Sequence, residues 1–219
     1  MIIAIDGPAG AGKSTIARRI AQKLGFLYID TGAMYRALTL KVLEEGIGIK
    51  DTAKIVAAAS RIKIRLSNCS DGPLKVMLDG EDVSRAIRQA RITRYVSDIA
   101  KIKAVRECMV KLQREFAETS DSVLDGRDVG TIVFPRAEKK FYLDANFQER
   151  VRRRHKELIE GGQSVTRAEV EADLRNRDTL DSTRAVAPLR RAEDAVYVDT
   201  TQMSIEEAAD TVLKHIGSI

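Results

Sequence analysis

Short apolar runs alternate with amphipathic helical repeats along the first part of the chain. Apolar runs of four residues suit strands that are buried on both faces of a parallel sheet. Apolar residues at helical spacing follow each run, and Gly25 and Gly46 are suited to end the two helices. The predicted elements are strands over 2–5 and 26–29 and helices over 13–24 and 34–45. This alternation of strand and helix is typical of an α/β fold.

The alternation stops after a short alanine-rich helix that is predicted over 51–60. Residues 61–66 alternate strictly between charged and apolar side chains, which predicts a half-exposed strand. A turn cluster over 68–73 separates this strand from a second one over 74–78, so the pair is expected to be antiparallel. We therefore predict a small antiparallel sheet inserted into the α/β core.

The core pattern resumes in the second half of the chain. The predicted elements there are helices over 90–100 and 103–118 and strands over 122–125, 140–143 and 195–198. Thr166 with Glu169, and Ser204 with Glu207, have the spacing of a capping box, which marks the first residues of two further helices.

Composition indicates one soluble globular domain that carries a small insertion. The 219 residues are 44% hydrophobic and 32% charged. No apolar stretch reaches membrane-spanning length, and the first residues lack the features of a signal peptide, so we expect a cytoplasmic protein.

Cys69 and Cys108 form neither a CxxC pair nor a disulfide framework. His155 and His215 lack the spacing of metal ligands, which argues against zinc chemistry and histidine base catalysis.

The charge distribution permits two interpretations. A net charge of +5 and a pI of about 9.2 raise the question of nucleic-acid binding. The arginines crowd between residues 127 and 191, with four of them between 150 and 154. Such a run is usually a solvated helix face. An enzyme that joins two phosphate-bearing substrates, however, needs several guanidinium groups in one cleft.

Residues 7–14 match the phosphate-loop pattern G-x-x-x-x-G-K-[ST] between a predicted strand and a predicted helix. In such a loop, backbone N–H groups and the helix N-terminus surround a polyphosphate, Lys13 reaches its β- and γ-phosphates, and Ser14 can hold Mg²⁺. The pattern arises by chance in a chain of this length with a probability of about one per cent. We therefore predict nucleoside triphosphate binding. The predicted contacts are Gly7, Pro8, Ala9, Gly10, Ala11, Gly12, Lys13, Ser14 and Thr15.

The residues beyond the loop favour a kinase of a small molecule over other proteins that share it. The N-K-x-D segment of guanine-specific GTPases does not occur in the sequence. Asp125 ends an apolar run like the acidic residue that accompanies a phosphate loop, and the chain beyond it is rich in arginine. Both features favour phosphoryl transfer to a second small substrate.

Four segments resemble the bacterial cytidylate kinases, and the resemblance extends over essentially the whole chain. They are DGPAGAGKS at 6–14, DTGAMYR at 30–36, DGRDVGT at 125–131 and RAVAPL at 184–189. Thr31 stands where the family more often has serine, so a hydroxyl is kept. The implied fold is that of the P-loop nucleoside-monophosphate kinases, with a five-stranded parallel sheet flanked by helices, an inserted antiparallel sheet and an arginine-rich lid. The implied parts are a core over 1–30, 120–147 and 178–219, a monophosphate-binding domain over 31–119, and a lid over about 148–177.

The resemblance also implies an acceptor site. Its implied residues are Thr31, Tyr35, Arg36, Ser97, Arg106, Arg127, Asp128, Arg177, Asp181 and Arg184. Thr31, Arg36 and Arg127 would hold the acceptor 5′-phosphate, since a dianionic phosphate favours guanidinium forks. Asp128 would accept a hydrogen bond from the cytosine N4 amine. Uracil has a carbonyl at that position, and a carboxylate would repel it.

The other implied roles concern the base, the sugar and the transferred phosphate. Ser97 and Arg106 would face the cytosine, although both lie on predicted helices and would also suit a solvated surface. Arg177 and Asp181 are implied for the sugar hydroxyls. Arg184 is implied for the region where the phosphates of the two substrates meet.

The lid arginines cannot all share one face of a helix. Arg150, Arg153 and Arg154 recur at near-helical spacing, so we predict them as the phosphate partners in the lid, with Arg150 and Arg154 on the ATP side. The predicted catalytic set is Lys13, Arg127, Arg153 and Arg184.

The expected activity is Mg²⁺-dependent transfer of the γ-phosphoryl group of ATP to CMP or dCMP. The acceptor phosphate is already an oxyanion at neutral pH, so positioning and charge neutralisation suffice. We expect a monomer without nucleic-acid or membrane partners. Two alternatives stay open, namely a kinase of another small acceptor such as UMP, AMP or shikimate, and a non-catalytic P-loop protein that binds nucleic acid.

Overall fold

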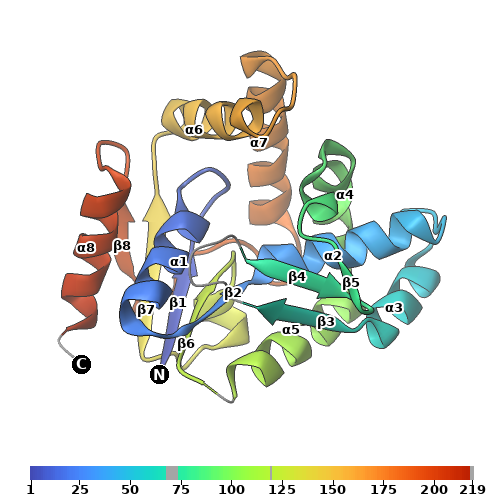
Figure 1. Ribbon diagram of the computed structural model, residues 1–219, viewed down its shortest axis with the longest axis horizontal. Coiled ribbons are helices and arrows are strands. Elements are labelled where there is room, and N and C mark those ends of the chain that lie inside the picture. Colours follow the sequence, from blue (N-terminus) through green and yellow to red (C-terminus); the bar gives the residue numbers. More distant parts are fainter. Residues whose placement is uncertain (68–73, 119, 218–219) are drawn as a thin grey trace.

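A five-stranded parallel sheet forms the centre of the computed structural model, which describes residues 1–67, 74–118 and 120–217. Its strands are β1 (Ile2–Asp6), β2 (Leu27–Asp30), β6 (Ser122–Asp125), β7 (Lys139–Asp144) and β8 (Val196–Asp199). Their spatial order is β2-β6-β1-β7-β8, so β1 lies in the middle (Figure 1). The α/β fold and the five-stranded parallel sheet predicted from the sequence are confirmed.

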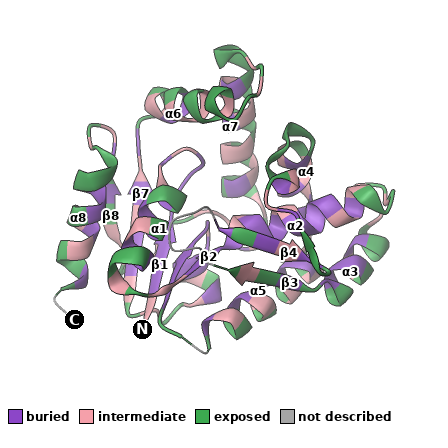
Figure 2. Cartoon of the chain, viewed as in Figure 1, coloured by how far each residue is buried: buried purple, intermediate pink, exposed green. Residues whose placement is uncertain are grey.

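The central strand shows why the apolar runs become strands here. Ile3 and Ile5 are fully buried, because β1 pairs with β6 on one side and β7 on the other while helices cover the faces of the sheet. Figure 2 shows the buried residues concentrated on the sheet and on the helix that follows β2. A strand in this position has no solvent-facing side, which explains its uninterrupted apolar sequence.

Eight α-helices and two short helical turns complete the described part of the chain. The α-helices are α1 (Lys13–Leu24), α2 (Thr31–Glu44), α3 (Thr52–Arg61), α4 (Ala90–Ala100), α5 (Lys103–Ala117), α6 (Phe147–Glu160), α7 (Arg167–Thr183) and α8 (Ile205–Ile216). The turns are the 3₁₀ helix η1 (Ala86–Arg88) and the π-helix η2 (Val129–Val133). Helices α6 and α7 lie at the end of the molecule opposite the two termini (Figure 1).

The inserted sheet is confirmed and has one more strand than predicted. Its antiparallel strands are β3 (Ile64–Ser67), β4 (Lys75–Leu78) and β5 (Glu81–Asp82). The predicted alternation is present, with Ile62 and Ile64 buried and Lys63 exposed. The strand begins at Ile64 and not at residue 61, because Arg61 is the last residue of α3. The turn predicted over 68–73 lies outside the described residues.

Local capping signals set several helix boundaries. Both predicted capping boxes are formed, at the first turns of α7 and α8. Helix α2 begins at Thr31, three residues earlier than predicted, because the Asp30 side chain accepts a hydrogen bond from the Ala33 N–H. Thr31 therefore lies in the first turn of a helix.

Two further expectations concern the whole chain. In the parts of the chain described above, no helix is long and apolar enough to cross a membrane. Cys108 is a free thiol, whereas Cys69 lies outside the described residues.

Candidate functional site

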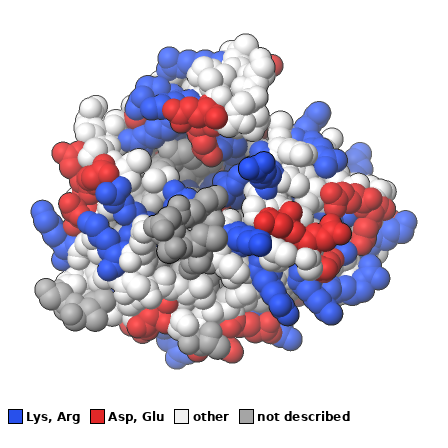
Figure 3. Space-filling model, viewed as in Figure 1, with Lys and Arg blue, Asp and Glu red and all other residues white. Residues whose placement is uncertain are grey.

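All five strands of the parallel sheet end in an aspartate at the same edge. The five residues are Asp6, Asp30, Asp125, Asp144 and Asp199. Carboxyl ends of parallel strands are where open α/β sheets bind ligands. A cavity of about 1060 Å³ opens at this edge. Figure 3 shows basic side chains around the hollow in the centre of one face.

The cavity brings most of the predicted donor and acceptor residues together. Those that line it are Ala9, Gly10, Gly12, Lys13, Ser14, Thr15, Thr31, Tyr35, Arg36, Ser97, Arg106, Arg127, Asp128, Arg154, Arg177, Asp181 and Arg184. Those that do not line it are Gly7, Pro8, Ala11, Arg150 and Arg153. Both predicted substrate sites thus share one cavity, as joint binding of two nucleotides requires.

The phosphate loop connects β1 to α1 and depends on its glycines. Gly10 and Gly12 have φ angles of 79° and 85°, which side-chain-bearing residues adopt only with strain. The Lys13 ammonium donates to the Pro8 carbonyl at 2.6 Å. Burial lowers the pKa of Lys13 to about 7, and the nearby Arg127 charge acts in the same direction. A polyphosphate in the loop would supply the counter-charge that this amine needs.

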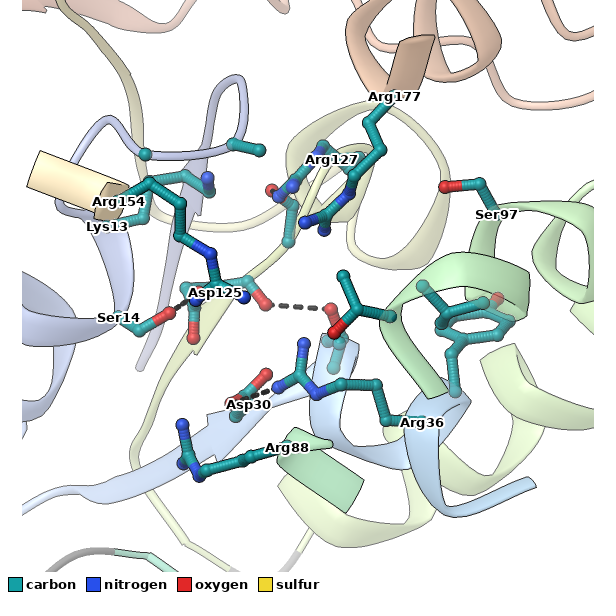
Figure 4. Close-up of a pocket in the computed structure, with 18 of the residues that line it drawn as sticks. Lys13, Ser14, Asp30, Arg36, Arg88, Ser97, Asp125, Arg127, Arg154 and Arg177 are labelled. Atoms are coloured by element: carbon teal, nitrogen blue, oxygen red, sulfur yellow. Dashed lines mark hydrogen bonds and ion pairs between the residues drawn. The ribbon is translucent and has the colours of Figure 1, made fainter. Parts of the chain in front are cut away.

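Ser14 and Asp125 provide the oxygen ligands that a magnesium ion prefers. The Ser14 hydroxyl donates to the Asp125 carboxylate at 2.7 Å (Figure 4). Burial raises the pKa of Asp125. Among the described residues, no group of three or more acidic, histidine or cysteine side chains could hold a metal. The Ser14 hydroxyl and the Asp125 carboxylate fit Mg²⁺, which usually takes few protein ligands and completes its shell with substrate phosphates and water.

Arginines from four separate elements converge on the middle of the cavity. Figure 4 shows Arg36 of α2, Arg127 after β6, Arg154 of α6 and Arg177 of α7 pointing toward a common region. Arg36 pairs with Asp30 at 2.9 Å, and Arg127 pairs with Asp181 at the same distance.

Several cavity guanidinium groups have a buried donor without a hydrogen-bond partner. The Nε atoms concerned are those of Arg36, Arg106, Arg154 and Arg177. Burial, together with the nearby charge of Arg127, lowers the pKa of Arg177 to about 10. Unpartnered buried donors in a native protein call for an explanation. An anion between these arginines would supply both the acceptors and the negative charge.

The end of the cavity near α4 and α5 is built around Asp128. This carboxylate pairs with Arg106, and its other oxygen lies 3.5 Å from an Arg184 nitrogen. The ring of Tyr35 lies 5.4 Å from the Arg106 guanidinium carbon, and burial raises the pKa of Tyr35 to about 12. Ser97 of α4 also borders this end of the cavity. These groups offer both donors and acceptors to the edge of a flat polar ring.

The side chain of Asp6 holds the turn that carries Asp128. Asp6, the last residue of β1, accepts hydrogen bonds from the Val129 and Gly130 N–H groups at 2.8 and 2.7 Å. Burial raises the pKa of Asp6 to about 6, although these two hydrogen bonds oppose the shift. The carboxylate thereby fixes the first turn of η2 directly after Asp128. Sequence analysis did not single out this role of Asp6.

Two of the three predicted lid arginines contact protein groups and not the cavity. Arg150 donates to the Ala9 carbonyl at 3.1 Å and to Asp178 at 2.6 Å. Arg153 donates to the Thr200 carbonyl at 2.6 Å. Their roles as phosphate partners stay predictions, whereas Arg154 borders the cavity.

Further basic residues of the cavity wall were missed in the sequence. They are Arg18, Arg85 and Arg88. Arg88 ends η1 and lies near Asp30 and Arg36 in Figure 4. Arg18 lies on α1, shortly after the phosphate loop, whereas no motif surrounds Arg85 and Arg88, which lie far from that loop in the sequence. The contact of η1 with α2 places Arg85 and Arg88 at the site.

Sequence comparisons with known proteins agree on one family. The family described as cytidylate kinase matches residues 3–218. A cytidylate kinase of Desulforamulus reducens is 50% identical, covering 96% of this chain and 94% of the relative. A cytidylate kinase of Bacillus subtilis is 47% identical, covering 98% of this chain and 95% of the relative. A solved shikimate kinase from Bacteroides thetaiotaomicron has a TM-score of 0.50 at 14% identity, covering 100% of this chain and 99% of that one, which indicates a shared fold alone.

Proposed function

The chain belongs to the cytidylate kinase family, and from this premise we infer that it transfers the γ-phosphoryl group of ATP to CMP or dCMP. The products would be ADP and CDP or dCDP. The observation that carries the assignment of this cavity is the set of unpartnered guanidinium Nε donors of Arg36, Arg106, Arg154 and Arg177. Arg36, Arg154 and Arg177 point toward a common region of the cavity, whereas Arg106 pairs with Asp128 (Figure 4).

We assign the donor to the phosphate loop. Its N–H groups, the N-terminus of α1 and Lys13 would hold the β- and γ-phosphates. Magnesium, held by Ser14 next to Asp125 together with those phosphates, would neutralise charge that develops during transfer. Arg154 borders the cavity on the lid side and is the lid arginine best placed for the donor phosphates.

We assign the acceptor to the opposite half of the cavity. Thr31 and Arg36 at the first turns of α2, with Arg127, would bind the 5′-phosphate of CMP. Arg177 and Asp181 would bind the sugar. The acceptor oxygen is anionic at neutral pH, so it needs no general base and only has to be held in line with the γ-phosphate.

We assign the cytosine to the group around Asp128. Its carboxylate would accept a hydrogen bond from the N4 amine, and Arg106 and Ser97 would face the ring acceptors. Arg106 and Arg184 already pair with this carboxylate, so a base that binds here would join a charged network. Uracil would bring a carbonyl toward the same carboxylate and bind less well.

The expected division of the chain follows from these assignments. The core would comprise 1–30, 120–147 and 178–219, with a monophosphate-binding domain over 31–119. Residues of about 148–177, which include α6 and most of α7, would form a lid that closes over the phosphates and excludes water. One chain supplies every residue named for the site, which supports a monomer, and we expect it in the cytoplasm.

An acceptor profile tests the proposed function. ADP formation is measured in a coupled assay with ATP, Mg²⁺ and each of CMP, dCMP, UMP, AMP, GMP and shikimate. We expect the highest kcat/KM with CMP or dCMP. Equal or better values for UMP or AMP would contradict the base assignment, and activity with shikimate alone would contradict the acceptor class.

A further inference from the structure

A buried tyrosine, Tyr28, contacts Asp125, the acidic residue next to Ser14 in the proposed metal site. Tyr28 lies on β2 and its side chain is almost fully enclosed, at 4% exposure. Its hydroxyl donates to one oxygen of Asp125 at 2.8 Å, while Ser14 donates to the other oxygen at 2.7 Å. Strands β2 and β6 pair in parallel, with Tyr28 opposite Val123 and Asp30 opposite Asp125. Tyr28 therefore lies close to Asp125 on the neighbouring strand.

This arrangement fixes the orientation of Asp125. A carboxylate with a donor on each oxygen cannot rotate without breaking one of the two hydrogen bonds. Both donors are neutral hydroxyls, so neither cancels the negative charge of Asp125. The charge would stay available to a cation held at Ser14, and the Ser14 hydroxyl directs its proton toward Asp125.

We propose that Tyr28 is a positioning residue for the magnesium site. Its hydroxyl holds the Asp125 carboxylate in the orientation that accepts the Ser14 proton, so that the Ser14 oxygen would be free to bind the metal. This inference rests on the proposed function insofar as a Mg²⁺-nucleotide is the donor. The competing explanation is that Tyr28 only fills the core, since its ring belongs to the main cluster of buried residues.

The variant Tyr28→Phe separates the two explanations because it removes one oxygen and keeps the ring. Partners that orient a metal ligand typically change metal affinity by about 10–100-fold when they are removed. We expect Mn²⁺ to bind the complex of Tyr28→Phe with ADP about 10-fold more weakly than the wild-type complex, as measured by electron paramagnetic resonance. Affinity for CMP without metal should not change, and excess Mg²⁺ should restore kcat.

Two matched variants complete the experiment. Tyr197→Phe removes a half-exposed phenol on β8 and should leave Mn²⁺ affinity unchanged. In an Asp125→Asn background, Tyr28→Phe should cause no further loss, because the carboxylate that it orients is gone. If the losses of Mn²⁺ affinity caused by the two substitutions add in the double variant, the proposal is overturned, even if Tyr28→Phe lowers stability.

Further outcomes separate this inference from the proposed function. Unchanged Mn²⁺ affinity in Tyr28→Phe would overturn the positioning role, and so would an equal loss of metal and CMP affinity. Mn²⁺ binding to the ADP complex is measured without an acceptor. A wild-type enzyme that binds Mn²⁺·ADP but does not phosphorylate CMP would contradict the proposed function and leave the test of Tyr28 intact.

Discussion

Replacing Asp128 with asparagine separates a role in reading the base from a role in orienting arginines. The carboxylate is 6% exposed and lies between Arg106 and Arg184. Asparagine keeps the shape of the side chain but removes its charge. Its amide can turn an N–H toward the O4 carbonyl of uracil, which a carboxylate cannot do.

The substitution should also destabilise the fold, and the structure indicates by how much. Arg106 is 3% exposed and would lose its counter-charge. Removing one partner of a buried ion pair costs about 3–5 kcal/mol. Arg106 retains its hydrogen bond to the Ala100 carbonyl at 3.2 Å and its contact with the Tyr35 ring. We therefore expect the lower end of that range, about 3 kcal/mol, in urea unfolding of the nucleotide-free protein.

The specificity effect is expressed as a ratio and is therefore independent of the loss of stability. A good polar contact to a base edge contributes about 1–3 kcal/mol to discrimination. The ratio of kcat/KM for CMP over UMP should therefore fall about 10-fold or more in Asp128→Asn. Both values are measured by ADP release on one enzyme preparation, at a temperature well below the unfolding midpoint of the variant.

An unchanged ratio would refute the reasoning. If Asp128 only orients Arg106 and Arg184, both monophosphates should lose kcat/KM to the same extent. Asp194→Asn is the matched control, because that carboxylate is largely exposed and pairs with Lys140 at 2.8 Å outside the cavity lining. Its CMP-to-UMP ratio should equal that of the wild type.

Three further predictions concern the phosphate-binding residues. Lys13→Met should lower kcat about 100-fold or more, and retention of more than about a tenth of the rate would contradict its role. In the nucleotide-free protein the same variant should be more stable than the wild type at pH 7, because the lowered pKa of buried Lys13 means that folding disfavours its charge. That cost is fully present below about pH 7 and declines as the pH rises toward the ordinary pKa of 10.5, so the advantage in urea unfolding should shrink at pH 9. Arg36→Ala should raise KM for CMP far more than KM for ATP, and the reverse result would show that the two sites are assigned backwards.

Local sequence signals determined most of the secondary structure. Short apolar runs predicted all five strands of the parallel sheet, because a strand buried on both faces, such as β1, needs apolar side chains at nearly every position. The capping boxes at Thr166 and Ser204 fixed two helix starts, since their hydrogen bonds join residues three apart. The phosphate loop was equally evident, because its function depends on the backbone of consecutive residues.

Features that depend on side-chain direction could not be obtained from the sequence in the same way. Arg150, Arg153 and Arg154 share one helix and one spacing pattern, yet only Arg154 borders the cavity. The other two are turned toward the phosphate loop and the Thr200 carbonyl by the packing of α6. The spacing of charged residues predicts which of them share one face of a helix. Which other elements contact that face is decided only when the helix packs in the folded protein.

The contacts that build the site join residues far apart in the chain. Tyr28 and Asp125 are 97 residues apart, and Asp6 and Gly130 are 124 residues apart. The resemblance to a known family directed attention to Arg36, Arg127 and Asp128, but neither it nor the pattern of residues gave any signal for Arg88 or for the hydroxyl of Tyr28. The sequence by itself determined the elements and the phosphate loop, because both are encoded by neighbouring residues. Only the tertiary structure decided which guanidinium and hydroxyl groups face the cavity, because it sets the register of β2 against β6 and the packing of η1, α6 and α7 around their carboxyl ends.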